Sequence, residues 1–411
     1  MNIYLIIIIT VLIVEYILDL YVEWMNVKNV SCELPDEFKE YYDAAKYKRS
    51  QEYLKENTFF GLIKGSIYTI ITVFFILFGG FNFVDLTARS FSDSTVLTGL
   101  IFAGILIFLI QIISIPFSAY HTFVIEEKYG FNKTTVLTFI TDILKSWILT
   151  ALIGGVMFYG IILFFMKAGS FAWVYCWFSI TLFQLFLMFI APVAIMPLFN
   201  KYIPLEKGEL NEEIEKYARS QKFKMKGVFK MDASRRSTKS NAFFTGFGRF
   251  RRIALFDTLI ERHTVSELVS VLAHEIGHYK KKHIIKNLII SILTSGFMFF
   301  VLSFFINNEG LFSAFKMNNI SVYASLIFFG FLFSPINYLL SIFTNILSRK
   351  YEYEADAFAI NTYKKPEDFI NALKKLSVAN LSNLTPHPLK VFLSYTHPPV
   401  LKRIDMIRKS I

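Results

Sequence analysis

The sequence predicts an all-α polytopic membrane protein, with seven transmembrane helices and a mainly helical extramembrane part that carries a small β-hairpin. Hydrophobic residues make up 54% of the 411 residues, charged residues only 18%, and the mean hydropathy is +0.46. Soluble globular domains carry about a quarter charged residues. In addition, seven apolar segments are long enough to cross a bilayer, and the long polar stretches are confined to 200–283 and 348–411.

The apolar segments satisfy the length requirement of membrane helices. A helix needs about 20 apolar residues to cross the hydrocarbon core, where its backbone groups must be hydrogen-bonded within the segment. The first segment lacks the basic start and the small-residue cleavage site of a signal peptide, so we expect an uncleaved anchor. The expected spans are 3–21, 62–83, 96–117, 146–165, 173–195, 284–305 and 322–347.

Basic residues alternate between the two sides of these spans as the positive-inside rule requires. The loops before the second span and after the third are rich in lysine and arginine, whereas each connection on the other side has a single one. The N-terminus is therefore expected outside and the C-terminus in the cytoplasm. The cytoplasmic group is Lys28, Lys39, Lys46, Lys48, Arg49, Lys55, Lys128, Lys133 and Lys145, and the opposite group is Arg89, Lys167 and Lys316.

This topology divides the chain into four segments. Residues 1–199 form spans one to five, 200–283 a first cytoplasmic part, 284–347 spans six and seven, and 348–411 a second cytoplasmic part. Because the chain crosses a membrane, we attribute its net charge of +11 to contact with membrane lipid. We expect no nucleic acid as a partner. Any chemistry should be divided between the two cytoplasmic parts.

The first cytoplasmic part carries a His-Glu-x-x-His motif directly after an apolar run. On a helix, His274 and His278 are about one turn apart and face the same side, so both imidazoles can bind one Zn²⁺. Glu275 lies beside them and can act as general base toward the attacking water. With only two cysteines in the chain, a metal must be held by histidines and carboxylates. The motif therefore predicts a zinc hydrolase with one zinc ion per chain.

The third ligand is expected in the second cytoplasmic part, because a catalytic zinc has three protein ligands and one open position. Glu352 and Asp356 share one helix face, whereas Glu354 lies about 200° from Glu352. We expect Glu352 as the ligand. Asp356 is placed to accept the second N–H of a ligating imidazole, which fixes its tautomer and raises its basicity. Mn²⁺ and Co²⁺ also suit this ligand set.

Two further segments are candidates for substrate handling. Residues 240–257 predict two short strands joined by a glycine turn, and an exposed edge there can bind a peptide by strand addition. Near the C-terminus, His397 and Arg403 can each stabilise a developing oxyanion or bind a substrate carboxylate. The alternatives are a plain hairpin and a structural histidine.

Together these residues resemble the type I CAAX prenyl protease family of integral-membrane zinc metalloproteases. The resemblance also includes 124–133 after the third span, 195–206 after the fifth, and the His397-Pro398-Pro399 tail, all in family order. It covers about 124–405. Two positions depart from the family pattern: Tyr129 stands where histidine is common, and Glu354 adds a negative charge beside the ligand.

The resemblance implies that the seven helices enclose a water-filled intramembrane chamber capped by a zincin domain. Such a chamber would explain Glu15 and Asp19 within the first span, because carboxylates are costly in lipid. The site residues that it implies are His274, His278 and Glu352 as zinc ligands, Glu275 as the base, Asn241 and Ala242 in the substrate-binding strand, and His397 and Arg403 beside the tetrahedral intermediate.

The predicted function is a membrane zinc endopeptidase with a peptide or protein substrate. The family resemblance implies removal of the last three residues from a prenylated Cys-a-a-X C-terminus. We expect a monomer in the endoplasmic reticulum or a bacterial inner membrane, with the site facing the cytoplasm. The alternatives are a quality-control protease without a prenyl requirement, or an inactive scaffold or transporter with a structural metal. A site-2 type intramembrane protease is disfavoured, because three lysines at 280–282 separate the motif from the sixth span.

Overall fold

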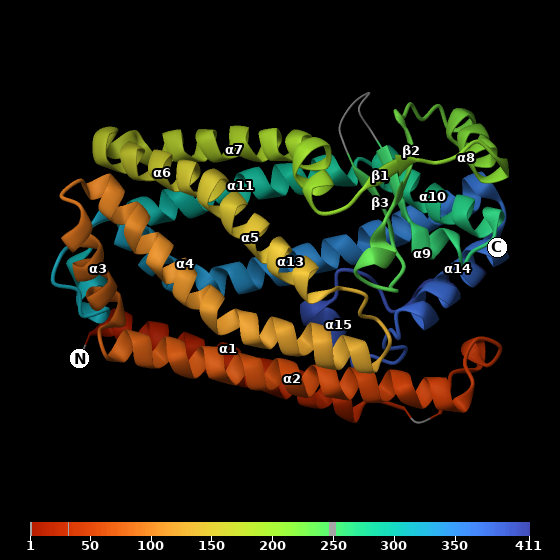
Figure 1. Ribbon diagram of the computed structural model, residues 1–411, viewed down its shortest axis with the longest axis horizontal. Coiled ribbons are helices and arrows are strands. Elements are labelled where there is room, and N and C mark those ends of the chain that lie inside the picture. The colour runs from red at the N-terminus through yellow and green to blue at the C-terminus, as the bar shows by residue number, and fades with distance from the viewer. Residues whose placement is uncertain (1, 32, 246–251) are drawn as a thin grey trace.

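The computed structural model describes residues 2–31, 33–245 and 252–411. These include seven helices long and apolar enough to cross a membrane, which confirms the predicted number. The two chain ends lie at opposite ends of the long axis, as an odd number of spans requires (Figure 1). The spans are α1 (Ile3–Lys28), α2 (Ala44–Leu77), α4 (Thr95–Tyr120) with η2 (His121–Glu126), α5 (Val136–Leu149) with η3 (Thr150–Gly154) and α6 (Gly155–Lys167), η4 (Gly169–Phe171) with α7 (Ala172–Ile190), η5 (Ala191–Ile195) and η6 (Met196–Leu198), α11 (His283–Ser303), and α13 (Val322–Tyr363).

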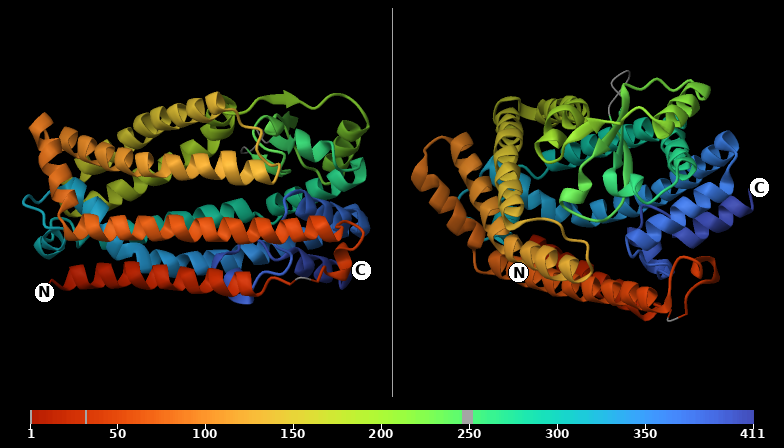
Figure 2. Two further views of the ribbon diagram at one scale, coloured as in Figure 1. Left: turned by 60° about the horizontal axis from the view of Figure 1, so that its bottom comes forward. Right: turned by 45° about the vertical axis from the view of Figure 1, so that its right-hand side comes forward.

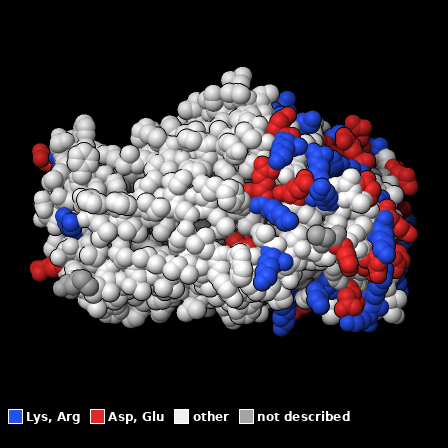
Figure 3. All heavy atoms as spheres, turned by 90° about the horizontal axis from the view of Figure 1, so that it is seen from below, with Lys and Arg blue, Asp and Glu red and all other residues white. Residues whose placement is uncertain are grey.

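Charge is distributed as expected for a protein that crosses a bilayer. Figure 3 shows acidic and basic side chains crowded at one end of the molecule, whereas the middle of the same face is almost free of them. The membrane-crossing helices expose large apolar side chains, including Phe178 (61% exposed), Leu293 (62%) and Leu339 (66%). The chain is therefore an integral, multi-pass membrane protein.

The spans form a wall one helix thick. Each span buries only 6% to 22% of its most apolar window inside the protein. Figures 1 and 2 show α1 and α2 along one side of the molecule and α6 and α7 along the other. On α1, Glu15 accepts a hydrogen bond from Ser334 of α13 (3.1 Å), and Asp19 is exposed. This arrangement is the one that the predicted chamber requires.

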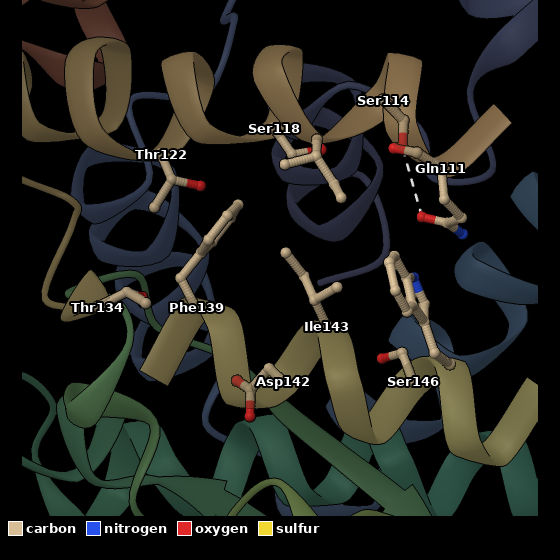
Figure 4. A pocket seen from close by; sticks show the side chains of 11 residues that line it. Gln111, Ser114, Ser118, Thr122, Thr134, Phe139, Asp142, Ile143 and Ser146 are labelled. Atoms are coloured by element: carbon tan, nitrogen blue, oxygen red, sulfur yellow. Dashed lines mark hydrogen bonds between the residues drawn. The ribbon is translucent and has the colours of Figure 1, made fainter. Parts of the chain in front are cut away.

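The wall is not closed by side-chain packing between α4 and α5. A pocket of about 420 Å³ lies there, with Ser118 and Thr122 on one side and Phe139 and Ile143 on the other (Figure 4). Ser114 donates a hydrogen bond to Gln111 at 3.4 Å along the same helix. Hydroxyl groups facing a gap between membrane helices are consistent with a hydrated interior.

Several predicted span limits differ from the helix bounds, and two of these differences have a clear structural cause. The second span was expected to continue to residue 83, but α2 ends at Leu77, Gly79 adopts a left-handed conformation (φ 73°), and α3 (Gly80–Phe91) follows in a new direction. The fourth span was expected to begin at 146, but α5 begins at Val136. Asp142 interrupts the apolar pattern there, and its carboxylate is bound by Arg236, with Nε–Oδ2 at 2.8 Å.

The predicted hairpin is part of a larger sheet. The expected strands are present as β3 (Ala242–Thr245) and β4 (Arg252–Phe256), paired antiparallel, and the predicted glycine turn lies outside the described residues. The sequence did not predict β1 (Tyr202–Pro204) and β2 (Gly227–Met231). The strand order is β1-β2-β4-β3, with β2 and β4 parallel, so β3 is an edge strand.

The helices of the charged end of the molecule pack on this sheet and on each other. In α10 (Val265–Lys280), a capping box between Thr264 and Glu267 starts the helix, and Leu268, Leu272 and Ile276 repeat at i, i+4 and i+8 on its buried face. The remaining elements are η1 (Asp36–Phe38), α8 (Glu209–Ser220), η7 (Ala233–Arg235), α9 (Asp257–Ile260), α12 (Glu309–Ala314), α14 (Pro366–Ala379), α15 (Pro388–Ser394) and α16 (Val400–Arg408).

The 42-residue helix α13 joins the membrane part to the extramembrane part without interruption. It passes through the expected segment boundary at 347/348, so Glu352 lies on the same rigid helix as the seventh span. The division into segments 1–199, 200–283, 284–347 and 348–411 stays a prediction.

At the opposite end, we expect a buried carboxylate to stabilise the helix packing. Asp85 of α3 is fully buried, accepts a hydrogen bond from the Tyr323 hydroxyl of α13, and is bound by Arg89 Nε at 2.8 Å. Asp85→Ala should lower the unfolding free energy by about 1–3 kcal/mol, because the Tyr323 hydroxyl loses its acceptor. Thermal unfolding in detergent measures this, and the exposed Asp93→Ala is the control; equal melting temperatures for the two variants would contradict the expectation.

Candidate active site

The site is built where α10 packs against α13. Gly277, inside the His-Glu-x-x-His motif, makes the close approach possible. A Cβ at Gly277 would lie 3.0 Å from the Ala355 carbonyl oxygen, 3.1 Å from Ala355 Cα and 3.2 Å from Phe358 Cβ. A side chain at this position would therefore force the neighbouring helix to move by a few tenths of an ångström, whereas glycine allows the close approach that brings the motif next to Glu352.

Three side chains converge between the two helices. His278 Nε2 lies 3.1 Å from His274 Nε2 and 3.3 Å from Glu352 Oε1, and His274 Nε2 lies 3.4 Å from Glu352 Oε2. Each residue offers one ligand atom, and all three atoms lie within 4.8 Å of one another. The histidine spacing and the Glu352 helix face, both inferred from the sequence, thus meet at one point.

Asp356 lies behind His274, as the helix-face argument predicts. Its Oδ1 is 2.7 Å from His274 Nδ1. Arg403 of α16, which is buried, donates to both oxygens of Asp356, from Nε at 2.8 Å and from one terminal nitrogen at 2.5 Å. Burial lowers the pKa of His274, but its contacts with Asp356 and Glu352 outweigh this and raise the pKa to about 9. Arg403 is thus oriented toward Asp356, and its third nitrogen lies 3.6 Å from Glu352 Oε2.

Glu275 is half-buried beside the cluster. Burial raises the pKa of its carboxyl, partly opposed by His274 and His278. Among the described residues, none makes a hydrogen bond or ion pair with its carboxylate. The carboxylate is therefore available to a water molecule or a substrate group.

His397 reaches the cluster from the C-terminal segment. Its Nε2 lies 3.3 Å from Glu352 Oε1, and its side chain remains 65% exposed. Thr396 Oγ1 lies 2.9 Å from His397 Nδ1 and restrains the ring. The imidazole therefore directs its Nε2 toward Glu352 and remains accessible to a bound substrate.

The strand that was expected to bind substrate begins at the sheet edge. Asn241 is exposed and immediately precedes β3, and its own Oδ1 accepts a hydrogen bond from the Ala242 amide at 2.8 Å. Asn380 fixes this start of the strand through two hydrogen bonds with the Ser240 backbone, at 3.0 and 3.1 Å. Among the described residues, β3 pairs on one side only, with β4.

Sequence reasoning missed His283 and its connection to Glu354. His283 lies between Glu354 and one ligand, 3.0 Å from His278 Nδ1 and 3.1 Å from Glu354 Oε2. The only indication was the position of His283 five residues after His278. By contrast, the pocket between α4 and α5 includes none of the predicted site residues.

Seven spans, a His-Glu-x-x-His helix and a carboxylate from a second helix together define an integral-membrane metallopeptidase. Comparisons with known proteins agree. Residues 23–201 match the family model described as CAAX prenyl protease N-terminal, five membrane helices, and residues 204–411 match Peptidase family M48. The chain belongs to this CAAX prenyl protease family of M48 metallopeptidases.

Individual relatives are similar over most of their length. The probable CAAX prenyl protease 1 of Schizosaccharomyces pombe is 36% identical over 96% of this chain and 86% of the relative. CAAX prenyl protease 1 of Saccharomyces cerevisiae is 32% identical over 96% of this chain and 93% of the yeast protein. The crystal structure of S. mikatae Ste24p superposes with a TM-score of 0.93 at 31% identity, covering 98% of this chain and 99% of that one.

The close approach at Gly277 generates a prediction. In Gly277→Ala, the added methyl meets the Ala355 backbone, and overpacking of this kind costs about 1–3 kcal/mol, against about 1 kcal/mol gained in helix propensity. We therefore expect lower thermal stability and weaker metal binding, measured on the same detergent-purified sample. Gly61→Ala in α2, where nothing lies within 4 Å, should bind metal like the parent and lose no thermal stability. Unchanged metal binding in Gly277→Ala would argue against this packing.

Proposed function

We propose that this protein is a zinc endopeptidase that removes the last three residues from prenylated Cys-a-a-X proteins, with His274, His278 and Glu352 as the zinc ligands. The convergence of these three ligand atoms within 4.8 Å is the observation that carries the proposal. The names of the relatives support the substrate class. A quality-control protease without a prenyl requirement remains the competing outcome of the test below.

The residues present fit a zinc ion. Glu352 Oε2 is buried, and no residue that the structure describes donates a hydrogen bond to it, since His274 Nε2 and Arg403 lie only at ion-pair distances of 3.4 and 3.6 Å. A bound cation would satisfy this oxygen. Two imidazoles and one carboxylate are the donor set of catalytic zinc. When bound, zinc supplies a Lewis acid that polarises the scissile carbonyl and favours ionisation of water.

The surrounding side chains have distinct roles in this proposal. Glu275 takes a proton from the attacking water and passes it to the leaving amine, and its raised pKa suits both steps. His397 donates from Nε2 to the developing oxyanion. Asp356 holds the Nδ1 proton of His274, and Arg403 orients Asp356. The substrate-binding role expected of Arg403 from the sequence stays a prediction.

Substrate would bind along the free edge of β3. An extended peptide added there would pair with the strand backbone, and Asn241 is exposed at the start of that edge. We propose that Asn241 and Ala242 hold the peptide in this way. The five helices α4 to α7 and α11 need contribute no sequence-specific contact, because backbone pairing gives affinity without demanding one sequence.

We further propose a monomer whose site faces the cytoplasm. The basic residues of the loops before the second span and after the third support this orientation. The endoplasmic reticulum membrane is proposed over a bacterial inner membrane, because the relatives compared come from fungi.

Glu275→Gln tests the base. The amide cannot accept the water proton, so we expect turnover to fall by about 10²–10⁴-fold while zinc content is retained. Peptide hydrolysis and metal analysis on the same preparation measure both properties. The exposed Glu261→Gln, upstream of α10, should match the parent, and parental turnover in Glu275→Gln would refute the base assignment.

The substrate class is tested with matched farnesylated and unmodified peptides, with and without a chelator. We expect chelator-sensitive cleavage that strongly favours the farnesylated peptide and releases its last three residues. Equal cleavage of both peptides would replace the prenyl-specific proposal with the quality-control alternative. Zinc binding without cleavage of either peptide would favour the scaffold alternative.

A further inference from the structure

A continuous line of hydrogen bonds runs from the second ligand histidine to Glu354. His278 Nδ1 lies 3.0 Å from His283 Nδ1, and His283 Nε2 lies 3.1 Å from Glu354 Oε2. His283 is the first residue of α11, and its side chain is only 2% exposed. Its ring stacks on Tyr351 of α13 at 4.3 Å and 12°. The imidazole therefore has little freedom to turn away from His278.

These contacts are compatible with one arrangement of protons. His278 faces Glu352 and His274 through Nε2, so this nitrogen must be unprotonated to bind a metal, and its proton sits on Nδ1. His283 must then accept at Nδ1 and carry its own proton on Nε2. That proton is donated to Glu354, whose carboxylate can only accept.

The two ligand histidines are therefore supported in parallel ways. Asp356 contacts Nδ1 of His274 directly, at 2.7 Å. Glu354 is connected to His278 through His283, which contacts both side chains. A carboxylate that accepts the second proton of a ligand imidazole fixes its tautomer and raises its basicity.

We propose that His283 and Glu354 are positioning residues that hold His278 as an Nε2 ligand and strengthen zinc binding. The inference rests on the proposed function in so far as it takes His278 to be a zinc ligand. It gives a role to Glu354, the negative charge by which this sequence departs from the family pattern.

A purely structural role is the competing explanation. Lys286 of α11 lies 3.9 Å from Glu354 and 5.0 Å from the Tyr351 ring centroid, so this group of side chains also joins α11 to α13. Loss of such a junction would change thermal stability. It would leave the affinity of the folded protein for zinc unchanged, and this difference separates the two explanations.

The test is the equilibrium zinc affinity of the full-length protein in detergent, measured by competition with a chelator of known affinity. Glu354→Ala removes the acceptor, and we expect about 10–100-fold weaker binding. Glu354→Gln keeps an acceptor oxygen without the charge and should lose less. Glu215→Gln, in an exposed pair with Arg219, is the matched control and should equal the parent.

A second variant tests the bridge itself. His283→Phe keeps a ring over Tyr351 but cannot hydrogen-bond, so zinc binding should weaken at least as much as in Glu354→Ala. If His283→Phe does not fold, the Glu354 variants decide alone, because that side chain is 29% exposed and tolerates change. Zinc affinity of folded Glu354→Ala within twofold of the parent would overturn the inference and leave the proposed function standing. A parent that binds no zinc would overturn both.

Discussion

The packing of α10 against α13 is the constraint on which the rest of the structure depends. Gly277 allows the Ala355 backbone to approach to a distance at which a Cβ would be crowded, with only 3.0 Å to the Ala355 carbonyl oxygen. Because His274 and His278 lie one turn apart on α10, and Glu352 and Asp356 one turn apart on α13, a single helix contact places four polar groups together. A shift of either helix would separate His274 and His278 on α10 from Glu352 on α13.

The same contact connects the chemistry to the membrane. Helix α13 is 42 residues long and forms both the seventh span and the wall of the site, and α11 begins three residues after α10 ends. The buried polar groups of the site therefore lie on or beside α11 and α13, two helices that also cross the membrane. Arg403 and His397 approach from the C-terminal segment and complete the cluster from the open side.

The relative positions of site residues could be predicted from the sequence where the residues share one unbroken helix, and could not be predicted across a helix break. His274 with His278, and Glu352 with Asp356, follow from helical periodicity within unbroken helices, so the sequence indicated their faces. His283 lies beyond a break, where Lys282 adopts a left-handed conformation (φ 59°) and periodicity no longer applies. The strand β1 has only three residues, too few for an alternating pattern to be recognised.

The central claim is that two helices supply a three-ligand zinc site, and X-ray absorption spectroscopy at the zinc edge tests it most directly. The account predicts one zinc per chain, with two imidazole nitrogens at about 2.0–2.1 Å and carboxylate oxygen in the same shell. In Glu352→Ala, the zinc should be lost or retain only the imidazole pair. A parent spectrum without imidazole scattering, or a Glu352→Ala spectrum identical to that of the parent, would contradict the account.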